Sequence, residues 1–320
     1  MLEPAIAQAL AAEGRRIVIT GAGGWLGLAT LDLLGAALGD DLPKRVRAFG
    51  STARTLLLSD GTQILQRPLA DLPWLPHEPT IVLHTAFLTK DRAEAMDEAQ
   101  YRAANAAISQ TVLNALGPIG AQALFLASSG AAAKADDSQA SPAMRLYGAM
   151  KREDEDRFAQ WAQDTGHTAV IARLYALAGP RINKPQAYAI ASFMLDALAA
   201  RPIAVRSPRE VVRAYAAIRE VMSLSFALIL QGQGVTRFDS GGTPLELAQV
   251  AAQVAALVPG ASVTRAPITD PASDIYHGDG EAYAGLLAQH AITPVPLQDE
   301  IARMLDWIVQ AQAFKLTSIA

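Results

Sequence analysis

Tyr147 and Lys151 form the pair whose residue types and spacing best suit acid–base chemistry. Residues four apart on a helix lie on the same face. An ammonium group held near a phenol favours the phenolate, so Lys151 is expected to lower the pKa of Tyr147 and let it exchange a proton with a substrate oxygen. Because a Tyr and a Lys also occur at this spacing by chance on protein surfaces, the pair needs support from its surroundings.

Two serines, Ser128 and Ser129, stand upstream of this pair, at the end of an apolar run that has the character of a strand. Open parallel sheets bind ligands at the carboxyl ends of their strands. A hydroxyl group at that edge can hydrogen-bond a reacting carbonyl. Ser-Ser-Gly alone is an ordinary loop sequence, so the interpretation depends on the combination with the Tyr–Lys pair.

A glycine-rich segment, running from Thr20 to Gly27 as TGAGGWLG, follows the first predicted strand and opens a helix that extends to about Leu38. Its glycines at 21, 24 and 27 permit a tight turn, close approach of the backbone to a pyrophosphate, and close packing of helix on strand. The free N–H groups at the start of the helix favour an anion. Strand, turn and helix together predict a dinucleotide-binding site.

Short apolar runs alternate with longer Ala- and Leu-rich stretches of helical spacing, which is typical of a parallel sheet covered by helices. The predicted fold class is therefore α/β, a doubly wound sheet of the Rossmann type. A hairpin is expected between Thr55 and Gln66, because Asp60-Gly61 suits a tight turn. The predicted strands are Arg16 to Thr20, Arg45 to Phe49, Thr80 to Thr85, Ala123 to Ser128 and Thr168 to Leu174.

The pattern changes after Gly179-Pro180, where prolines interrupt short helices and short strands. We expect a dinucleotide-binding domain over residues 1–178 and a smaller, irregular α/β substrate-binding part over residues 179–320, interleaved with the first at its edge and separated from it by a cleft. The charged run from Lys151 to Arg157 is expected to form the solvated face of a helix.

The composition excludes several classes of protein. The chain has 320 residues, 51% of them hydrophobic and 18% charged, which is enough to bury a substantial core. A formal net charge of −4 gives no general attraction to nucleic acid or acidic lipid. There is no Cys for a disulfide or a thiolate metal site, and the five His are too scattered for zinc.

The sequence also shows neither a signal-peptide pattern at its N-terminus nor a membrane span. The longest apolar stretch, Met222 to Leu230, is far shorter than the roughly 20 residues that cross a bilayer. We therefore expect a cytoplasmic enzyme without a metal, membrane or nucleic-acid partner.

The glycine segment, the serine pair and the Tyr–Lys pair, in this order, resemble the extended branch of the short-chain dehydrogenase/reductase family. This is the NAD(P)-dependent epimerase/dehydratase group, typified by enzymes that act on nucleotide sugars. The similarity continues at Val82 to Ala86, at Asn105 and at second-half landmarks such as Phe238 to Gly242. It extends over nearly the whole chain, so the family's fold and chemistry are expected throughout.

The resemblance implies a role for each matching residue. Tyr147 would be the acid/base residue, Lys151 would lower its pKa and hydrogen-bond the nicotinamide ribose, and Ser129 would orient the substrate oxygen, with Ser128 as the alternative. Hydride would pass between a substrate carbon and the nicotinamide. The residues expected to bind the cofactor are Gly21, Gly24, Trp25, Leu26, Gly27, Ser51, Arg54, Thr85, Ala86, Asn105, Tyr147 and Lys151.

The choice between NAD and NADP is expected to depend on the end of the second strand. An acidic residue there would accept hydrogen bonds from the ribose 2′-hydroxyl, and the segment Phe49 to Arg54, FGSTAR, contains none. Ser51 and Arg54 could instead accommodate a 2′-phosphate, so NADP(H) is slightly favoured over NAD(H). The alternative is that Arg54 points to solvent.

The substrate side departs from the nucleotide-sugar members of the family. Arg213 stands where those members bind the diphosphate, but Ala176 replaces an Asn and Tyr276 replaces an Arg. The loss of two polar contacts would weaken the binding of a diphosphate unless other groups compensate. The residues expected to contact substrate are Ser128, Ser129, Arg213, Tyr276 and His277.

Three functions remain open from the sequence. The preferred one is an epimerase, dehydratase or ketoreductase acting on a nucleotide-activated sugar, and the second is an NADPH-dependent reductase of a small non-sugar ketone or aldehyde. The third is a dinucleotide-sensing protein without turnover, although a sensor has no need of Ser129, Tyr147 and Lys151 together. The helices that carry Asn105 and Tyr147 are long and rich in Ala, and the resemblance implies that they form a homodimer contact.

Overall fold

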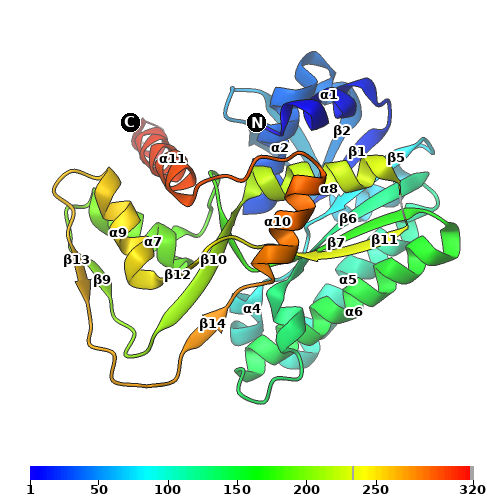
Figure 1. The fold of residues 1–320 in the computed structure, drawn as a ribbon. Coiled ribbons are helices and arrows are strands. Elements are labelled where there is room, and N and C mark those ends of the chain that lie inside the picture. Colours follow the sequence, from blue (N-terminus) through cyan, green and yellow to red (C-terminus); the bar gives the residue numbers. More distant parts are fainter. Residues whose placement is uncertain (233, 318–320) are drawn as a thin grey trace.

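The computed structural model describes residues 1–232 and 234–317 and is built on a sheet of eight strands with helices on both faces (Figure 1). The strand order is β11-β7-β6-β5-β1-β2-β4-β3, and every neighbouring pair is parallel except β3 with β4. The α/β, Rossmann-type prediction is confirmed. The strands are β1 (Arg16–Thr20), β2 (Val46–Gly50), β3 (Arg54–Leu57), β4 (Gln63–Pro68), β5 (Thr80–His84), β6 (Ala121–Ser129), β7 (Thr168–Leu174) and β11 (Val235–Asp239).

The five predicted strands are confirmed as β1, β2, β5, β6 and β7, with ends that differ from the prediction by at most two residues. The predicted hairpin is confirmed as β3 and β4. Its turn contains Gly61 at φ +87°, a backbone conformation that glycine adopts without strain. The hairpin also extends the main sheet, because β4 pairs with β2.

Two helical layers cover the sheet (Figure 1). On one face lie α2 (Trp25–Leu38) and α8 (Ile218–Gln231), and on the other lie α5 (Glu98–Leu116) and α6 (Pro142–Thr165). The two layers receive alternate residues of each strand, as a pleated strand requires. In β1, Ile17 and Ile19 belong to the apolar cluster beneath α2 and α8, whereas Val18 belongs to the cluster beneath α5 and α6.

The prediction of a solvated charged face on α6 is wrong for part of the run. Lys151, Asp154 and Glu155 are buried, whereas Glu153 and Asp156 are exposed. The run covers nearly two turns of helix, so its residues cannot all face solvent, and those spaced by three and four turn toward the sheet. The charged groups of these three residues therefore lie in the interior of the protein.

The second half forms smaller sheets and further helices to the left in Figure 1. Here β10 lies between β12 and β14, and β9 pairs with β13. The predicted domains also exchange strands, because β8 pairs with β10 and β11 completes the main sheet. The strands are β8 (Ala176–Ala178), β9 (Ile203–Val205), β10 (Val211–Ala217), β12 (Pro244–Glu246), β13 (Val263–Arg265) and β14 (Asp274–Tyr276).

Most of the remaining helices pack on other helices or on strands of the second half. Helix α1 packs on α2 and α8, and α7 packs on α9. No helix among the described residues is both long and apolar enough to cross a membrane. The remaining helices are α1 (Pro4–Ala12), α3 (Leu42–Arg45), α4 (Lys90–Ala95), α7 (Ala189–Leu198), α9 (Leu247–Leu257), α10 (Gly280–Gln289) and α11 (Leu297–Thr317), with 3₁₀ turns at Gly39–Asp41, Leu69–Trp74, Gly130–Lys134 and Pro185–Ala187.

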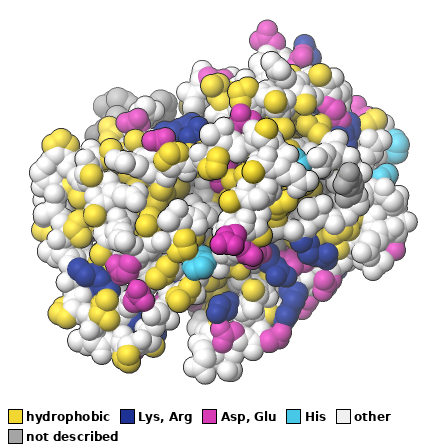
Figure 2. Space-filling view, viewed as in Figure 1, with side chains coloured by type: hydrophobic (Ala, Val, Ile, Leu, Met, Phe, Trp, Pro, Cys, Tyr) yellow, Lys and Arg dark blue, Asp and Glu magenta, His cyan; other side chains and the backbone are white. Residues whose placement is uncertain are grey.

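On the face drawn in Figure 2, acidic and basic side chains are interspersed. Mixed charge of this kind gives no single-sign field that would attract a polyanion to this face.

Candidate active site

The glycine turn lies between β1 and α2 and packs against the segment that follows β5. Gly21 has φ +71°, and a Cβ atom there would lie only 2.7 Å from the backbone nitrogen of Ala86. A Cβ atom on Gly27 would lie 2.7 Å from the carbonyl oxygen of Ala22. The Thr85 hydroxyl donates to the carbonyl of Thr20 at 2.7 Å. These contacts bring Gly21, Gly27, Thr85 and Ala86 together at the carboxyl edge of the sheet.

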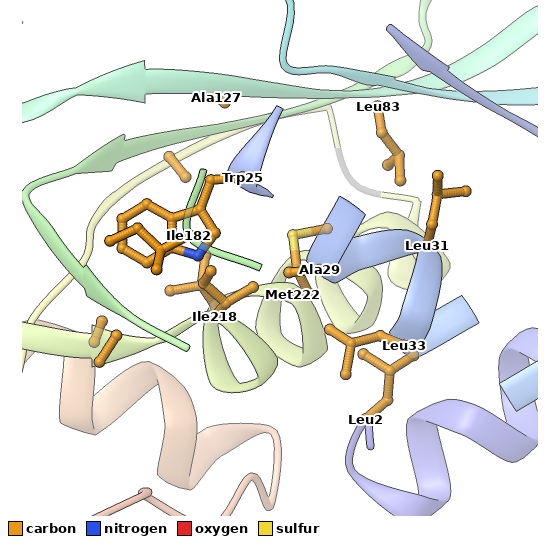
Figure 3. Packing of buried hydrophobic residues seen from close by; sticks show 14 of the residues in the cluster. Leu2, Trp25, Ala29, Leu31, Leu33, Leu83, Ala127, Ile182, Ile218 and Met222 are labelled. Carbon is orange, nitrogen blue, oxygen red and sulfur yellow. The ribbon is translucent and has the colours of Figure 1, made fainter. Parts of the chain in front are cut away.

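Trp25 joins the glycine turn to the second half of the chain. It is buried, and its indole Nε1 donates to the carbonyl of Pro180 at 2.8 Å. Its ring meets Tyr188 edge-on with centroids 5.0 Å apart, and Figure 3 shows it with Ile182 and Ile218 in the same buried cluster. The neighbouring Leu26 packs against this cluster. Trp25 and Leu26, both predicted to bind the cofactor, therefore attach the glycine turn to the apolar core.

Arg54 lies on the glycine turn. It is exposed, as is Ser51, but its guanidinium donates to the carbonyl of Gly23 at 3.1 Å. Of the two predicted 2′-phosphate residues, Ser51 follows β2 directly, and Arg54 begins β3 and contacts the turn. Because of this contact, Arg54 does not point only to solvent, which was the alternative.

Ser129 and two tyrosines meet at the end of β6. The Ser129 hydroxyl accepts a hydrogen bond from the backbone of Ala131 at 3.2 Å and lies 3.4 Å from the hydroxyl of Tyr276. Tyr147 reaches the same place from α6, where the Ser129 hydroxyl lowers its pKa and the nearby Tyr276 raises it. Three hydroxyl groups thus converge at one edge of the sheet.

The predicted direction of the Tyr147 pKa shift is wrong for the protein without a ligand. Burial raises the pKa of Tyr147 above its ordinary value, and this effect outweighs the hydrogen bond from Ser129. Burying a phenol penalises its charged form. Tyr147 is therefore protonated at neutral pH, which is the form that donates a proton.

Lys151 lies one turn along α6 and is buried. Its Nζ donates to the carbonyl of Ala127 at 2.8 Å and lies 3.8 Å from the centre of the Phe87 ring. The same Phe87 ring meets Tyr147 edge-on, with centroids 5.7 Å apart. Phe87 therefore contacts both residues of the Tyr–Lys pair.

Ser128 is directed away from Ser129, as alternation along a strand requires. Its hydroxyl donates to Glu155, which is 2% exposed and forms an ion pair with Arg173 at 2.7 Å. Arg173 makes two further hydrogen bonds to the same carboxylate. Ser128 thus belongs to a buried network that fixes α6 to β6 and β7, and Ser129 is the serine beside Tyr147.

Asn105 lies within α5 and is fully buried. Its side-chain oxygen accepts from the backbone N–H of Leu88 at 2.8 Å, while the Tyr101 hydroxyl donates to the carbonyl of Leu88 at 2.6 Å. These bonds hold the segment that follows β5. Asn105 is thus placed to position Ala86 and Phe87 rather than being exposed itself.

Arg213 and Tyr276 stand on the neighbouring strands β10 and β14. The guanidinium of Arg213 binds the carboxylate of Asp274, with contacts at 2.9 and 3.3 Å, and lies 5.8 Å from the centre of the Tyr276 ring. His277 follows Tyr276, with its Nδ1 3.0 Å from the carbonyl of Gly278. Tyr276 therefore reaches Ser129, one of the predicted catalytic residues, whereas Arg213 is paired with a carboxylate.

A model of the NAD-dependent epimerase/dehydratase family matches residues 17–238. The chain belongs to this family. Comparison with curated protein sequences found no match. The matched region includes the glycine turn, Ser129, Tyr147 and Lys151, so the chain is an NAD-dependent epimerase/dehydratase family enzyme with the family's fold.

Solved structures of similar fold include several epimerases and dehydratases. UDP-N-acetylglucosamine 4-epimerase from Methanobrevibacter ruminantium M1, in complex with UDP-N-acetylmuramic acid, is 15% identical with a TM-score of 0.72, over 93% of this chain and 99% of that one. A dTDP-glucose 4,6-dehydratase from Streptomyces venezuelae, solved with NAD, is 17% identical at 0.68, over 93% and 98%. UDP-glucose 4-epimerase from Thermus thermophilus, a complex with NAD, is 20% identical at 0.65, over 91% and 98%.

The residues of this epimerase/dehydratase family member fit a dinucleotide. Gly21 and Gly27 leave the turn free of side chains that the close packing would not admit. Gly24 is the N-cap of α2 and has no side chain to occupy the first N–H groups of the helix, which suit a phosphate. Among the described residues, by contrast, no group of three or more His, Asp or Glu side chains could hold a metal ion.

Two residues of this site were not predicted from the sequence. Phe87 follows the Thr85-Ala86 motif directly, but the sequence around an aromatic residue in a loop does not indicate which side chains it will contact. Tyr175 donates to the Asp239 carboxylate at 3.2 Å, and its ring centroid lies 4.9 Å from that of Tyr276. The glycine at position 278 is the one related feature of the sequence, because it leaves room for the Tyr175 ring. A Cβ atom at this position would lie 2.9 Å from that ring.

The buried Lys151 predicts a pH dependence of stability in this family member. Burial lowers its pKa to about 8 from 10.5, so between these values the unfolded chain binds more protons than the folded one. The contribution of Lys151 to the free energy of unfolding therefore increases as the pH rises through this window, by roughly 2 kcal/mol between pH 7.5 and 10.

Urea unfolding of the wild type and of Lys151→Met at both pH values measures this contribution, because subtraction removes the other titrating groups. The wild type should gain stability relative to the variant at the higher pH. Parallel pH profiles for the two proteins would show that Lys151 titrates normally.

Proposed function

We propose that this enzyme transfers hydride between a nicotinamide cofactor, preferentially NADP(H), and a carbinol or ketone carbon of a nucleotide-activated sugar. The observation that carries the proposal is the convergence of Ser129, Tyr147 and Tyr276 at the carboxyl edge of the sheet, with Lys151 one helical turn from Tyr147. Hydroxyl groups gathered in this way can hold and protonate one substrate oxygen.

Each residue has a separate task in the proposed reaction. The cofactor, held by the glycine turn and the segment after β5, supplies or accepts the hydride when it is bound. Ser129 donates a hydrogen bond to the substrate oxygen and orients it. Tyr147 is protonated and gives its proton to that oxygen as negative charge develops there, while the Lys151 ammonium stabilises the phenolate that remains. In the oxidative direction Tyr147 takes the proton back.

The nucleotide sugar is supported by the fold, which this chain shares with solved epimerases and dehydratases that carry nucleotide-sugar names. The partly exposed Arg213 would bind the diphosphate after releasing Asp274, which is half exposed and can turn to solvent. Epimerisation and dehydration differ in what happens to the oxidised sugar before hydride returns to it. Reduction would instead take its hydride from NAD(P)H and release the oxidised cofactor.

A second candidate is an NADPH-dependent reductase of a small non-sugar ketone or aldehyde. It is favoured by the engagement of Arg213 with Asp274 and by the presence of Tyr276 where an Arg was expected. Arg213 is paired with Asp274, and the second Arg of the nucleotide-sugar enzymes is replaced by Tyr276. The substrate side therefore offers two aromatic groups, Tyr175 and Tyr276, in place of diphosphate ligands.

The two candidates differ in what happens to the cofactor. Denaturing the purified protein and identifying the released nucleotide by mass spectrometry separates them, because an epimerase or dehydratase regenerates its cofactor within each cycle and keeps it bound. Tightly held dinucleotide, together with conversion of a UDP- or dTDP-sugar, would support the first candidate. Protein free of nucleotide that oxidises NADPH only with small ketones would support the second.

We also propose a homodimer through α5 and α6, which lie side by side on one face of the sheet (Figure 1). Both are long helices of 19 and 24 residues and have an outer face available to a second copy. Sedimentation velocity at micromolar concentration should give the mass of two chains. A single species with the mass of one chain would contradict the proposal.

A further inference from the structure

Gln66 is a buried polar residue that lies beneath the glycine turn. It stands on β4, opposite Ala48 of β2, and is only 2% exposed. Its amide fills space that two glycines leave free, since a Cβ atom on Gly50 would lie 2.5 Å from its Oε1 and one on Gly23 would lie 2.9 Å from it. Neither glycine can be replaced without displacing this side chain.

The orientation of the amide follows from its single partner. The Nε2 group donates to the backbone carbonyl of Thr52 at 2.7 Å. Because a carbonyl can only accept, the nitrogen must face Thr52 and the oxygen must face the glycine turn. This Oε1 atom is buried and has no hydrogen-bond partner among the residues that the structure describes.

A buried carbonyl oxygen without a donor is unfavourable, because folding removes it from water without replacing the lost hydrogen bond. Such an atom next to a predicted binding site indicates that a donor arrives with the ligand. The adenosine ribose of a dinucleotide carries hydroxyl donors. In sheets of this type, a residue at the end of the second strand accepts hydrogen bonds from them.

That strand ends here in Gly50, at the position where an acidic residue would contact the ribose. The side chain from β4 occupies the space that a side chain at Gly50 would fill. Arg54 approaches Gly23 as well, and donates to its carbonyl. A neutral acceptor and a cation thus meet at one glycine, near the position where NAD-binding sheets of this type have a carboxylate.

We propose that Gln66 replaces the acidic residue as the ribose acceptor and, being neutral, allows Arg54 to select NADP(H) over NAD(H). This inference rests on the proposed function, since it needs a dinucleotide at this site. A carboxylate would repel a 2′-phosphate and accept strongly from a 2′-hydroxyl. An amide accepts from a ribose hydroxyl without that repulsion, so the guanidinium attracts the phosphate unopposed.

The test is calorimetric titration of the full chain with NADPH and with NADH, which needs no turnover. The wild type should bind NADPH more tightly. Gln66→Glu should weaken NADPH binding about tenfold or more while NADH binding is kept or improved, so that the preference is lost or inverted. Gln63→Glu is the matched control, because it adds the same charge at an exposed position of the same strand and should leave both affinities unchanged.

Gln66→Met keeps the approximate volume of the side chain but removes both its acceptor and its donor to Thr52, and it should weaken the binding of both dinucleotides several-fold. This second variant carries the test if Gln66→Glu does not fold. Affinities for both dinucleotides that match the wild type in Gln66→Met, or a wild type that prefers NADH, would overturn the assignment of Gln66 alone. A wild type that binds neither dinucleotide would overturn the proposed function with it.

Discussion

Replacing Tyr147 with Phe should reduce turnover by about 10²- to 10⁴-fold, the range that a positioned general acid contributes. The substitution removes only the hydroxyl that converges with those of Ser129 and Tyr276, and it keeps the ring that meets Phe87 edge-on. Because the phenol donates its proton only as the substrate oxygen becomes charged, affinity for the dinucleotide should stay within a few-fold of the wild type. Steady-state kinetics and cofactor titration of the same preparation measure both quantities.

Tyr215→Phe is the matched control for this substitution. Tyr215 packs against the apolar core, so loss of its hydroxyl should leave turnover near the wild-type value. Ser129→Ala should give a smaller loss than Tyr147→Phe, because the substrate oxygen keeps its proton donor. Unchanged turnover in Tyr147→Phe would remove this residue from the catalytic role and, with it, the proposed chemistry of α6.

Arg173→Met should lower the free energy of unfolding by about 3–5 kcal/mol, the usual cost of leaving a buried charge without its partner. Glu155 is 2% exposed and receives three contacts from Arg173 in addition to the hydroxyl of Ser128. The variant keeps most of the apolar stem of Arg173 but leaves Glu155 with Ser128 alone. Urea unfolding near neutral pH gives the difference.

The double variant Arg173→Met with Glu155→Gln should recover part of this loss, since it removes the unpaired charge. Arg209→Met is the control for loss of a surface ion pair. Arg209 and Asp270 are 46% and 31% exposed, and such pairs contribute about 0–1 kcal/mol. Equal effects of Arg173→Met and Arg209→Met would show that the interior pair contributes no more than a surface one.

The main sheet could be predicted because its signals are local. The five predicted apolar runs coincide with β1, β2, β5, β6 and β7, and each binding turn follows its strand in the sequence. The edge strand β11 was not predicted, because its sequence VTRFD is not an apolar run. Gly21 and Gly27 were predictable for the same reason, since a turn that admits no Cβ requires glycine whatever surrounds it. The Tyr–Lys spacing likewise placed both residues of α6 on one face.

The remaining features depend on residues far apart in the chain. Ser128 and Ser129 are of the same type, and only the pleat of β6 sends one to Glu155 and the other to Tyr276. Burial raises the pKa of Tyr147 and outweighs its hydrogen bond with Ser129, and the tyrosines that add to the shift include Tyr188 and Tyr276 from the second half of the chain. Gln66 resembled any polar strand residue, and its place beneath Gly23 becomes evident only when β4 lies beside β2.

The exchange of strands between the two halves has a consequence for how the chain is made. On the ribosome, β7 emerges well before β11, its outer neighbour in the finished sheet, which lies more than sixty residues later at Val235–Asp239. Until then the nascent sheet ends in an apolar, unpaired strand, the kind of edge that recruits other chains. A chain terminated at residue 178 would keep that open edge permanently. The nucleotide-binding half is therefore not an independent domain that could be expressed alone. Its protection from aggregation depends on completing synthesis of the half that follows.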